Sequence, residues 1–445
     1  MTVVAQSMAK SNSIPLKTLF TSHKGKKPEV LTDTQIKDSV PYIDIKAFEK
    51  DEFRRFADKK TSQLVTEGEL LIVWDGARSG LIGRTPINGA LGSTLAVLRP
   101  RKNMDIISDY ALYFLRGQFH KINSNTRGTG IPHVDPEVLW KLELPQISPS
   151  EQQEVVNKLN EVLPRVRTAR ERAQRARDNL RRFLQSILQS AFRGELTEGW
   201  RKDNENQSAD IFLEEMLRLR ESEWPKGKKY KNPKEVICTP FGDIPSQWES
   251  VKSDALFSFV TSGSRGWAKY YSEEGALFIR IGNLSHETIH LDFKKNQHVS
   301  PPSGIEGSRT QIELNDLLIS ITADVGMVSH VSENMGEAYV NQHVAIARPV
   351  SVLNSKYLAY YFLSPEGQKQ LVGLQKGAIK AGLRLDDIKD ISVPLPSLEE
   401  QKEIVKRVEL YFEIADGVDK RLQNIIEDCE LTTSSVLLSA FKTNE

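Results

Sequence analysis

The stretch EQQEVV at residues 151–156 decides the fold of this 445-residue chain, because EQKEIV at residues 400–405 repeats it. Around these motifs, residues 144–193 and 393–442 align without a gap at a constant offset of 249, and they close on SAFR and SAFK. A long repeat that is present twice predicts two copies of one architectural unit. We therefore expect a pseudo-dimer within one polypeptide, which suits a target that comes in two halves.

Each copy of the repeat has the pattern of a long helix. Ser148 with Glu151, and Ser397 with Glu400, match the S-x-x-E capping box that begins a helix. Apolar residues then recur at alternating spacings of four and three, which is typical of a coiled coil. The stripe contains Val155, Leu159, Val162, Val166, Ala169, Ala173, Ala176, Leu180, Phe183, Ile187 and Ala191 in copy one, and Ile404, Val408, Tyr411, Ala415, Val418, Leu422, Ile425, Cys429, Thr432, Val436 and Ala440 in copy two. Pro164 is expected to kink the first helix.

The two helices are expected to pair with each other in an antiparallel coiled coil. The basic stretch 165–182 then faces the acidic stretch 411–428, so opposite charges flank the seam. The alternative is that each helix packs only on its own globular domain. The predicted fold class is α+β, with two globular domains separated by two long antiparallel helices and related by a pseudo-two-fold axis.

A globular region precedes each helix, and the two regions are weakly similar. Residues 94–100 match residues 343–349, whereas most of the remaining sequence differs. Short apolar runs broken by Gly, Asn and Pro predict strands, with a helical stretch near residues 106–120 and another near residues 356–371. A shared frame with different surfaces indicates two readers of different information.

Composition limits the class of protein. With 39% hydrophobic and 27% charged residues, the chain resembles an ordinary globular protein. We see no secretory signal and no apolar run that could span a bilayer, and the two cysteines fit a reduced, cytoplasmic compartment. The net charge of +1 hides an asymmetry, because residues 1–193 carry +10 and residues 194–445 carry −9. The first half is compatible with a polyanion, whereas the second needs local basic patches or another protein.

Catalytic motifs are not visible. HETIH at residues 286–290 matches the H-E-x-x-H pattern of zinc peptidases, which requires a helix. Ile289, Leu291 and Phe293 instead alternate with polar residues as in a strand, where the two histidines would be about 13 Å apart. We therefore predict no metal site. We also find no P-loop, no Gly-rich nucleotide fingerprint, no N/D-P-P-Y/F tetrapeptide and no Ser or Cys triad, so we expect a non-catalytic chain.

The order of these motifs points to a family. Two divergent globular regions each lead through a Pro-rich turn into an E-Q-x-E-[VI]-V helix, and the first helix closes on SAFRGELT at residues 190–197. FIRIGNL at residues 278–284, and WDGA at residues 74–77 with GST at residues 92–94, add to the pattern. This layout resembles the DNA-specificity subunit of Type I restriction–modification systems over essentially the whole chain.

The resemblance implies a division of labour. The expected parts are target-recognition domain 1 (1–147), a central spacer helix (148–194), a connecting segment (195–247), target-recognition domain 2 (248–396) and a C-terminal spacer helix (397–445). Each recognition domain would read one half-site of a bipartite, asymmetric double-stranded DNA target, and the helices would set the gap. Two methyltransferase subunits and the restriction–translocase subunits would dock on this chain. S-adenosylmethionine, ATP and Mg would belong to those partners, with no cofactor in this subunit and no membrane partner.

Candidate DNA-binding residues are polar or basic side chains in Gly-rich loops, where the backbone can approach closely. They are Lys24, Lys26, Lys27, Lys46, Arg78, Arg84 and Arg127 in the first domain, and Ser264, Arg265, Trp267, Lys269, Arg280, Asn283, Lys376, Lys380 and Arg384 in the second. Arg127 and Lys376 stand out because each precedes a glycine in a loop before the last strand. The alternative for Trp267 is a place in the core.

Two rival interpretations stay open. One is the DNA-reading subunit of a related bipartite restriction enzyme in which methylase and nuclease are fused. The other is a coiled-coil adaptor that binds proteins and never reads DNA, which the net charge near zero favours. For a DNA reader with an acidic second half, we expect weak DNA affinity alone and tight affinity with partners.

Overall fold

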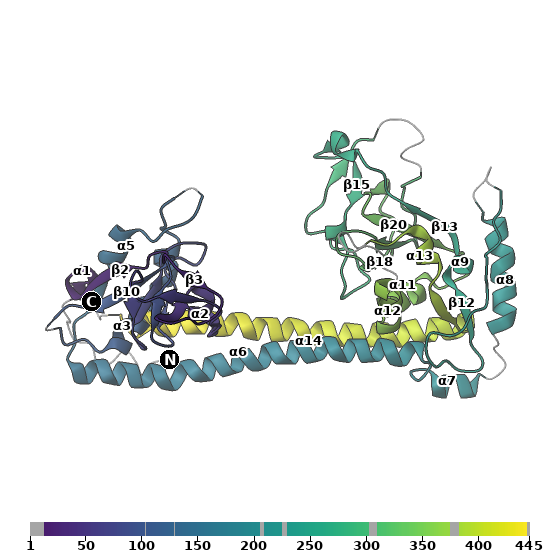
Figure 1. Ribbon diagram of the computed structural model, residues 1–445. Coiled ribbons are helices and arrows are strands. Elements are labelled where there is room, and N and C mark those ends of the chain that lie inside the picture. Colours follow the sequence, from purple (N-terminus) through teal and green to yellow (C-terminus); the bar gives the residue numbers. More distant parts are fainter. Residues whose placement is uncertain are drawn as a thin grey trace. The chain divides into compact units, whose positions relative to one another are not determined.

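The computed structural model describes residues 13–102, 104–128, 130–204, 209–224, 229–301, 309–373 and 382–442. The chain forms two compact units: unit 1 contains Met1–Gln174 and Leu422–Glu445, and unit 2 contains Arg175–Arg421. Each unit joins a globular part to one half of α6 (Pro149–Phe192) and one half of α14 (Leu398–Ser439), as Figure 1 shows. The predicted fold class, α+β with two long helices, is confirmed.

The globular part of unit 1 contains two sheets and a two-stranded ribbon. The first sheet has the order β2-β10-β7-β8, the second the order β3-β5-β4-β9-β6, and the ribbon joins β1 to β11. The strands are β1 (Ser13–Pro15), β2 (Phe20–Lys24), β3 (Leu31–Thr32), β4 (Ser39–Ile43), β5 (Phe56–Asp58), β6 (Leu64–Val65), β7 (Leu70–Val73), β8 (Ile82–Arg84), β9 (Gly89–Leu91), β10 (Leu95–Pro100) and β11 (Glu143–Pro145). The helices are α1 (Leu16–Leu19), α2 (Ile45–Lys50), α3 (Ser108–Gly117), α4 (Phe119–Asn123) and α5 (Pro136–Trp140).

Unit 2 repeats this plan with its own strands. Its sheets have the orders β13-β20-β17-β18 and β14-β16-β15-β19, and its ribbon joins β12 to β21. The strands are β12 (Glu249–Lys252), β13 (Phe257–Ser262), β14 (Tyr271–Ser272), β15 (Ala276–Ile279), β16 (His298–Val299), β17 (Leu317–Ser320), β18 (Val328–His330), β19 (Ala338–Val340), β20 (Val344–Pro349) and β21 (Ser392–Leu395). The helices are α7 (Glu198–Asp203), α8 (Ala209–Ser222), α9 (Ser253–Leu256), α11 (Ser355–Leu363), α12 (Pro365–Gly373) and α13 (Leu385–Lys389), with 3₁₀ turns η1 (Trp267–Tyr270) and η2 (Ile281–Asn283).

The first sheet of each unit is buried on both faces. In β7, Leu70 and Ile72 belong to the core that the sheet shares with α3, whereas Leu71 and Val73 belong to the core that it shares with the second sheet. Leu317 and Leu318 of β17 divide in the same way. Successive side chains of a strand point to opposite faces, so a run of apolar residues such as LLIV fills both layers at once.

The repeated E-Q motif fastens each long helix to the globular part. The Gln152 side chain accepts from the Ile107 backbone N–H, which lies just before α3, and donates to the carbonyl of Ile147 before α6. In unit 2, Gln401 accepts from the backbone N–H of Asn354 and donates to the carbonyl of Pro396. The glutamine therefore satisfies backbone groups at two chain turns with one amide, which explains why the motif occurs at the start of both helices.

The repeated SAF motif at the far end of each helix closes a core. Phe192, at the end of α6, packs edge-on against Tyr357 and Tyr361 of α11, with ring centroids 5.2 Å apart in both pairs. Phe441, just after α14, packs against Tyr110 and Phe114 of α3 at 5.0 and 5.5 Å. Within each unit, therefore, one long helix begins and the other ends against the same globular part.

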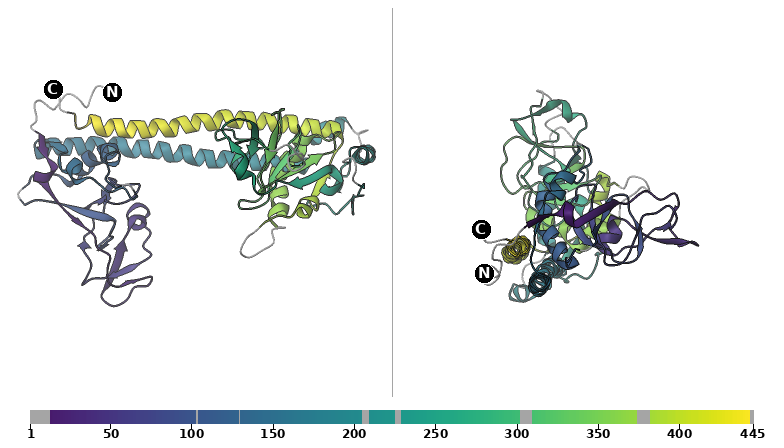
Figure 2. Two further views of the ribbon diagram at one scale, coloured as in Figure 1. Left: turned by 90° about the horizontal axis from the view of Figure 1, so that it is seen from above. Right: turned by 90° about the vertical axis from the view of Figure 1, so that its left-hand side faces the viewer.

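Within each unit the helix halves run antiparallel, side by side in the views of Figure 2. In unit 2, Arg177 bonds Asp419 at 2.6 Å, and Phe183 packs on Tyr411, eight positions earlier in α14. In unit 1, Arg170 pairs with Glu430 at 3.0 Å. The predicted antiparallel pairing, with basic residues of α6 facing acidic residues of α14, is confirmed. α6 is one continuous helix through Pro164.

At some positions of the predicted stripe, a neighbouring residue is more deeply buried instead. Val162 and Phe183 are 37% and 44% exposed, whereas their neighbours Leu163 and Leu184 are less exposed. In α14, Ile426 is buried and Ile425 is exposed. The sequence offers adjacent apolar residues at these points, and heptad spacing does not choose between them. The globular parts also cover one side of the pair, which turns the buried face toward them.

The HETIH segment is neither a helix nor a strand. Residues 286–290 form bends after η2, so the predicted strand was wrong. The Ile289 side chain is buried in the core of unit 2, which accounts for the apolar position in the segment, and its carbonyl accepts from the His330 backbone N–H. Among the described residues, no group of three or more His, Cys, Asp or Glu side chains could hold a metal ion. No helix of the described chain is both long and apolar enough to cross a bilayer.

Candidate functional site

Three loops of unit 1 come together where the strands of its first sheet end, and the described residues of the corresponding loops of unit 2 do the same. We call this group the loop surface. The first loop follows β2 or β13, the second follows β7 or β17, and the third precedes α5 or α13. In unit 1, Val134 N–H donates to the Trp74 carbonyl; in unit 2, Leu383 N–H donates to the Ile321 carbonyl. The matching bonds show that the loops correspond one to one in the two units.

A glycine at the start of the first loop allows the loop to approach the second sheet. A Cβ on Gly25 would lie 2.2 Å from the Gly92 carbonyl oxygen, and one on Gly263 would lie 2.0 Å from the Asn341 carbonyl oxygen. Both distances are far inside van der Waals contact, so only glycine fits. The two predicted residues that follow each glycine therefore lie in equivalent places. They are Lys26 and Lys27 in unit 1, and Ser264 and Arg265 in unit 2.

A charged chain of contacts crosses the loop surface of unit 1. Lys24 forms an ion pair with Asp75 at 2.7 Å, and Asp75 bonds Nδ1 of His133 at 2.7 Å. The Gly76 N–H donates to the Pro132 carbonyl, so the second and third loops are also joined through the backbone. Lys24 and His133 are therefore held in place while nearly half of each side chain remains exposed.

Arg127 lies in the third loop of unit 1 and is more than half exposed. Its guanidinium bonds Asp135 at 2.8 Å and Glu137 at 3.2 Å, and these bonds raise the pKa of Arg127. Its backbone pairs with that of His133 in both directions. Because guanidinium groups keep free donors beside a carboxylate, Arg127 can be oriented by the two acids and still bind a phosphate or a base edge.

The other exposed cations of unit 1 surround these loops. Lys26, Lys27 and Lys46 are exposed. Arg78 of the second loop forms an ion pair with Glu49 of α2, the helix that carries Lys46. The structure thus connects Lys46 and Arg78 through one short helix, and it connects Lys24 to Arg127 through Asp75 and His133.

The described part of the loop surface of unit 2 has a different set of contacts. The Ser264 hydroxyl accepts a bond from Arg309, Arg265 is exposed, and Lys269 lies over the ring of Tyr270. In the second loop, the Thr322 hydroxyl bonds Nδ1 of His343, where unit 1 has the Asp75 carboxylate. A hydroxyl therefore takes the place of a carboxylate at this position of the second loop.

The third loop of unit 2 is described only in part. Lys376 and Lys380 lie outside the described residues. Arg384 precedes α13 and is mostly exposed, and its guanidinium forms two bonds with Asp387, which raise its pKa. Arg280 is half-buried just before η2.

Three predicted residues have roles inside the fold. Arg84 of β8 bonds Asp109 and the Gly68 carbonyl. Trp267 is buried, with its ring stacked 5.2 Å from that of Phe278, so the core alternative holds for it. Asn283 is 3% exposed; it accepts from the Arg280 backbone N–H and donates to the Asp292 carbonyl. Because Arg84 and Asn283 use their polar groups in these bonds and Trp267 is buried, we omit these three residues from the proposed contacts.

Asp75, His133, Thr322 and His343 also lie at the loop surfaces, and the sequence reasoning did not select them. Asp75 and Thr322 are the second residues after the apolar strands β7 and β17, and polar residues just past the ends of buried strands are a usable signal. The histidines carried no such signal, because their partners lie 58 and 21 residues away in the chain.

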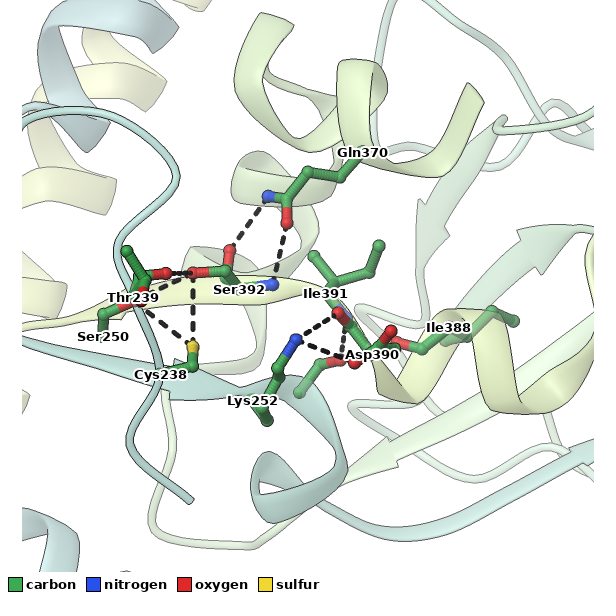
Figure 3. A network of polar contacts seen from close by, with 10 residues as sticks. Cys238, Thr239, Ser250, Lys252, Gln370, Ile388, Asp390, Ile391 and Ser392 are labelled. Atoms are coloured by element: carbon green, nitrogen blue, oxygen red, sulfur yellow. Dashed lines mark hydrogen bonds and ion pairs between the residues drawn. The ribbon is translucent and has the colours of Figure 1, made fainter. Parts of the chain in front are cut away.

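A second polar network lies in the ribbon of unit 2 and supports the fold. Figure 3 shows Ser392 of β21 bonded to Ser250 of β12 at 2.9 Å and, through its backbone, to Gln370 of α12. Cys238 Sγ lies 3.4 Å from the Ser392 hydroxyl, and Lys252 pairs with Asp390 at 2.7 Å. The network joins the segment that enters the globular part of unit 2 to the strand that leads into α14.

Comparison with known proteins follows the same division of the chain. A family model described as the Type I restriction modification DNA specificity domain matches residues 8–173 and 245–428. The Type I restriction enzyme EcoBI specificity subunit of Escherichia coli is 25% identical over 330 residues, which cover 74% of this chain and 64% of that subunit. The MjaVIII specificity subunit of Methanocaldococcus jannaschii is 24% identical over 415 residues, 91% of this chain and 84% of that one. The EcoBI match thus spans slightly less than two thirds of its relative.

A solved structure shares the fold. One chain from a study of complex assembly and conformational transition of the type I R-M system matches with a TM-score of 0.66 at 17% identity, covering 98% of this chain and 99% of that chain. At this identity the likeness concerns the fold alone.

Proposed function

Because this chain belongs to the family of Type I restriction modification DNA specificity domains, we propose that it is the non-catalytic DNA-specificity subunit of a Type I restriction–modification complex. It reads a bipartite, asymmetric duplex, with one half-site for each loop surface. The observation that supports this proposal is the duplicated frame. Gly25 and Gly263 place equivalent loops at equivalent ends of the first sheets, and the side chains on those loops differ. Equivalent placement with different chemistry suits two different half-sites.

Specific roles follow from exposure and partners. In unit 1, Arg127 is proposed to contact bases, because a guanidinium fits the two acceptors of guanine. The other proposed contacts of unit 1, to phosphates or bases, are Lys24, Lys26, Lys27, Lys46 and Arg78. In unit 2 the proposed contacts are Ser264, Arg265, Lys269, Arg280, Lys376, Lys380 and Arg384. The net charge of −9 over residues 194–445 leaves more of the affinity of the second loop surface to hydrogen bonds and to partner subunits.

The long helices are proposed to set the gap between the half-sites and to receive partners. Reading surfaces on one face of a duplex repeat every helical turn, about 34 Å. Two methyltransferase subunits and the restriction–translocase subunits supply methylation and cleavage, and they carry S-adenosylmethionine, ATP and Mg. The proposed boundaries are those expected from the sequence, with recognition domains at residues 1–147 and 248–396, and the proposed compartment is the cytoplasm.

The test is to purify the chain with its methyltransferase subunit and map the methylated adenines. Two short words separated by a constant gap are the expected result. Replacing residues 13–147 by another recognition domain should change one word and leave the other intact, and the same exchange of residues 248–396 should change only the second. Binding without sequence preference in the assembled complex would favour a protein adaptor and contradict the proposal.

A further inference from the structure

A groove of about 520 Å³ lies in unit 1 between α3–α4 and the halves of α6 and α14 that belong to this unit. Its apolar surface includes Leu163, Val166 and Leu437. Arg116 and His120 line it from the globular part, and Arg167 and Arg170 line it from α6. The single acidic residue among its lining residues is Glu430, which pairs with Arg170 at 3.0 Å. The groove is therefore apolar inside and basic at its rim.

Unit 2 has a groove at the pseudo-equivalent place, with a volume of about 360 Å³. The 249-residue offset relates the two linings: Leu163 corresponds to Phe412, and Val166 corresponds to Ala415. Three charged positions have changed sign. Arg167, Arg170 and Glu430 of unit 1 correspond to Asp416, Asp419 and Arg181 of unit 2, respectively. The two grooves have the same frame and opposite charge.

The groove of unit 2 is partly filled by the chain itself. Ser285, Glu287 and Thr288 line it from the loop after η2, and Glu287 pairs with Arg181 at 3.1 Å. Asp419 is bonded by Arg177 at 2.6 Å, which lowers the Asp419 pKa. An acidic loop segment is thus already bound beside the one cation of this groove. In unit 1, all lining residues come from α3, α4, α6 and α14, and no loop residue is among them.

We propose that the groove of unit 1 is the docking site of an acidic protein segment that carries an apolar side chain, and that two copies of one partner therefore bind the two units unequally. The inference rests on the proposed function, which brings two copies of a methyltransferase subunit to this chain. A segment that suits Arg167 and Arg170 meets Asp416 and Asp419 at the sister groove, where like charges repel. Several exposed ion pairs acting together change an affinity by about tenfold.

A DNA backbone is the other polyanion that could meet this rim. Phosphates would engage the arginines but would leave Leu163, Val166 and Leu437 without a partner, whereas a protein segment can cover apolar and charged groups together. The loop of Glu287 gives an example within this chain, because it brings both a charged residue and Thr288 to the lining of the sister groove.

The experiment uses the full chain and its methyltransferase subunit as the probe. Native mass spectrometry and sedimentation at graded salt give the affinities of the first and second copies. In the wild type we expect them to differ by about tenfold or more, with the tighter copy more sensitive to salt. The triple variant Arg167→Asp/Arg170→Asp/Glu430→Arg gives unit 1 the charges of unit 2 and keeps the cross-helix pair in reversed form. It should weaken the tighter copy by about tenfold, so that the two affinities converge.

The matched control is Arg172→Asp. Arg172 is exposed on α6 in unit 1, is absent from the groove lining, and its substitution changes the net charge by the same amount as the triple variant. It should leave both affinities within about twofold of the wild type. A gain-of-function variant, Asp416→Arg, should strengthen the weaker copy. Thermal melting of each variant separates a binding defect from a folding defect.

Three results would overturn the inference. Two copies that bind the wild type with equal affinity and equal salt dependence would show that the opposite charges of the two grooves do not affect partner binding. A triple variant that behaves like Arg172→Asp would place the partner elsewhere. A triple variant that loses affinity for non-specific duplex DNA, with methyltransferase binding unchanged, would make the groove a phosphate site. Failure of any copy to bind the wild type would reject the proposed function together with the inference.

Discussion

Unit 1 and unit 2 agree in the contacts that fasten the globular part to the long helices and differ in the contacts at the sheet edge. Tyr110 and Tyr357 donate to the carbonyls of the equivalent prolines Pro145 and Pro394. In β8, by contrast, Arg84 occupies the place that His330 takes in β18, opposite Leu70 and Leu317. The comparison teaches that a duplicated scaffold holds its frame through a few precise polar contacts, and that positions outside this frame can change charge and size.

Equivalent ion pairs in the two units differ in how their carboxylates titrate. Arg99 bonds Glu69 at 2.6 Å, and Arg348 bonds Asp316 at 2.7 and 2.9 Å. Burial acts to raise the Glu69 pKa, but the bonds from Arg99 and Thr66 outweigh it and lower that pKa. Asp316 has no exposed surface, and burial raises its pKa despite Arg348. Unit 2 therefore encloses a charge that unit 1 leaves near water.

Unit 2 has an additional layer that the described residues of unit 1 do not contain. α8 packs into its core through Phe212, Leu213 and Met216, and Glu223 after α8 accepts from Ser351. In unit 1, Met104 and Ile106 of the corresponding turn line a groove of about 440 Å³. Because α8 adds buried apolar area to unit 2, we expect unit 2 to be more stable than unit 1.

The largest expected effect comes from removing the closing phenylalanine of one unit. Phe192→Ala deletes a 2% exposed ring that touches two tyrosines, and should cost about 3–5 kcal/mol, because such truncations leave a cavity. Hydrogen exchange followed by mass spectrometry should show faster exchange in α11 and unchanged exchange in α3. Phe441→Ala should reverse that pattern.

The control is Phe183→Ala, since Phe183 is 44% exposed on α6 and should cost less than about 1 kcal/mol. Equal loss of protection in α3 and α11 for both Phe192→Ala and Phe441→Ala would contradict the assignment of each ring to one unit.

Acid should destabilise unit 2 through His330. This histidine is buried in β18, Nδ1 has no partner, and desolvation, with Lys356 and His290 nearby, lowers its pKa to about 4. The unfolded chain binds this proton below pH 6.5, whereas the folded chain binds it only near pH 4, so stability falls as pH decreases through that window. The loss is about 3 kcal/mol between pH 7 and pH 4.

His330→Gln keeps a polar group toward Ser355 and removes the titration, so urea unfolding of unit 2 should then depend less on pH across this window. Unit 1 has no histidine at the equivalent position of β8 and serves as the internal comparison. An unchanged pH profile in His330→Gln would exclude this residue as the cause.

The glutamates of the two E-Q motifs sharpen the comparison further. Glu400 is buried and accepts bonds from Thr197, Arg201 and Trp248. Its equivalent Glu151 is not buried, and it accepts from the backbone N–H and the hydroxyl of Ser148. Glu400→Gln should cost about 2 kcal/mol, because it leaves the buried Arg201 beside a neutral group, and Glu151→Gln about 0.5 kcal/mol. Thermal melting of the pair measures the difference, and similar costs would mean that the additional bonds of Glu400 do not contribute.

Sequence patterns predicted the frame better than the site. The capping boxes, the helix lengths and the antiparallel pairing follow from local signals, since charge and spacing are properties of neighbouring residues. The choice between Val162 and Leu163 depends on where the globular part lies, and the bends at His286 depend on the distant His330 backbone. Lys24 and Arg127 could be predicted as surface residues because they lie in or beside loops. The structural roles of Arg84 and Asn283 depend on partners elsewhere in the chain, which no spacing rule predicts.

The smallest expected effect compares Lys27 with Arg265, which occupy the same place in the two first loops, two residues after Gly25 and Gly263. Each side chain is exposed, so alanine should leave the fold intact and reduce binding of the complex by about 1 kcal/mol, roughly fivefold. Methylation rates on targets with single base changes separate the two roles. A base contact loses discrimination at one position of its own half-site, whereas a phosphate contact weakens all targets alike and reduces the salt slope by about 1. Lys27→Ala should not change base discrimination in the half-site that unit 2 reads. Such a change would contradict the assignment of one half-site to each loop surface.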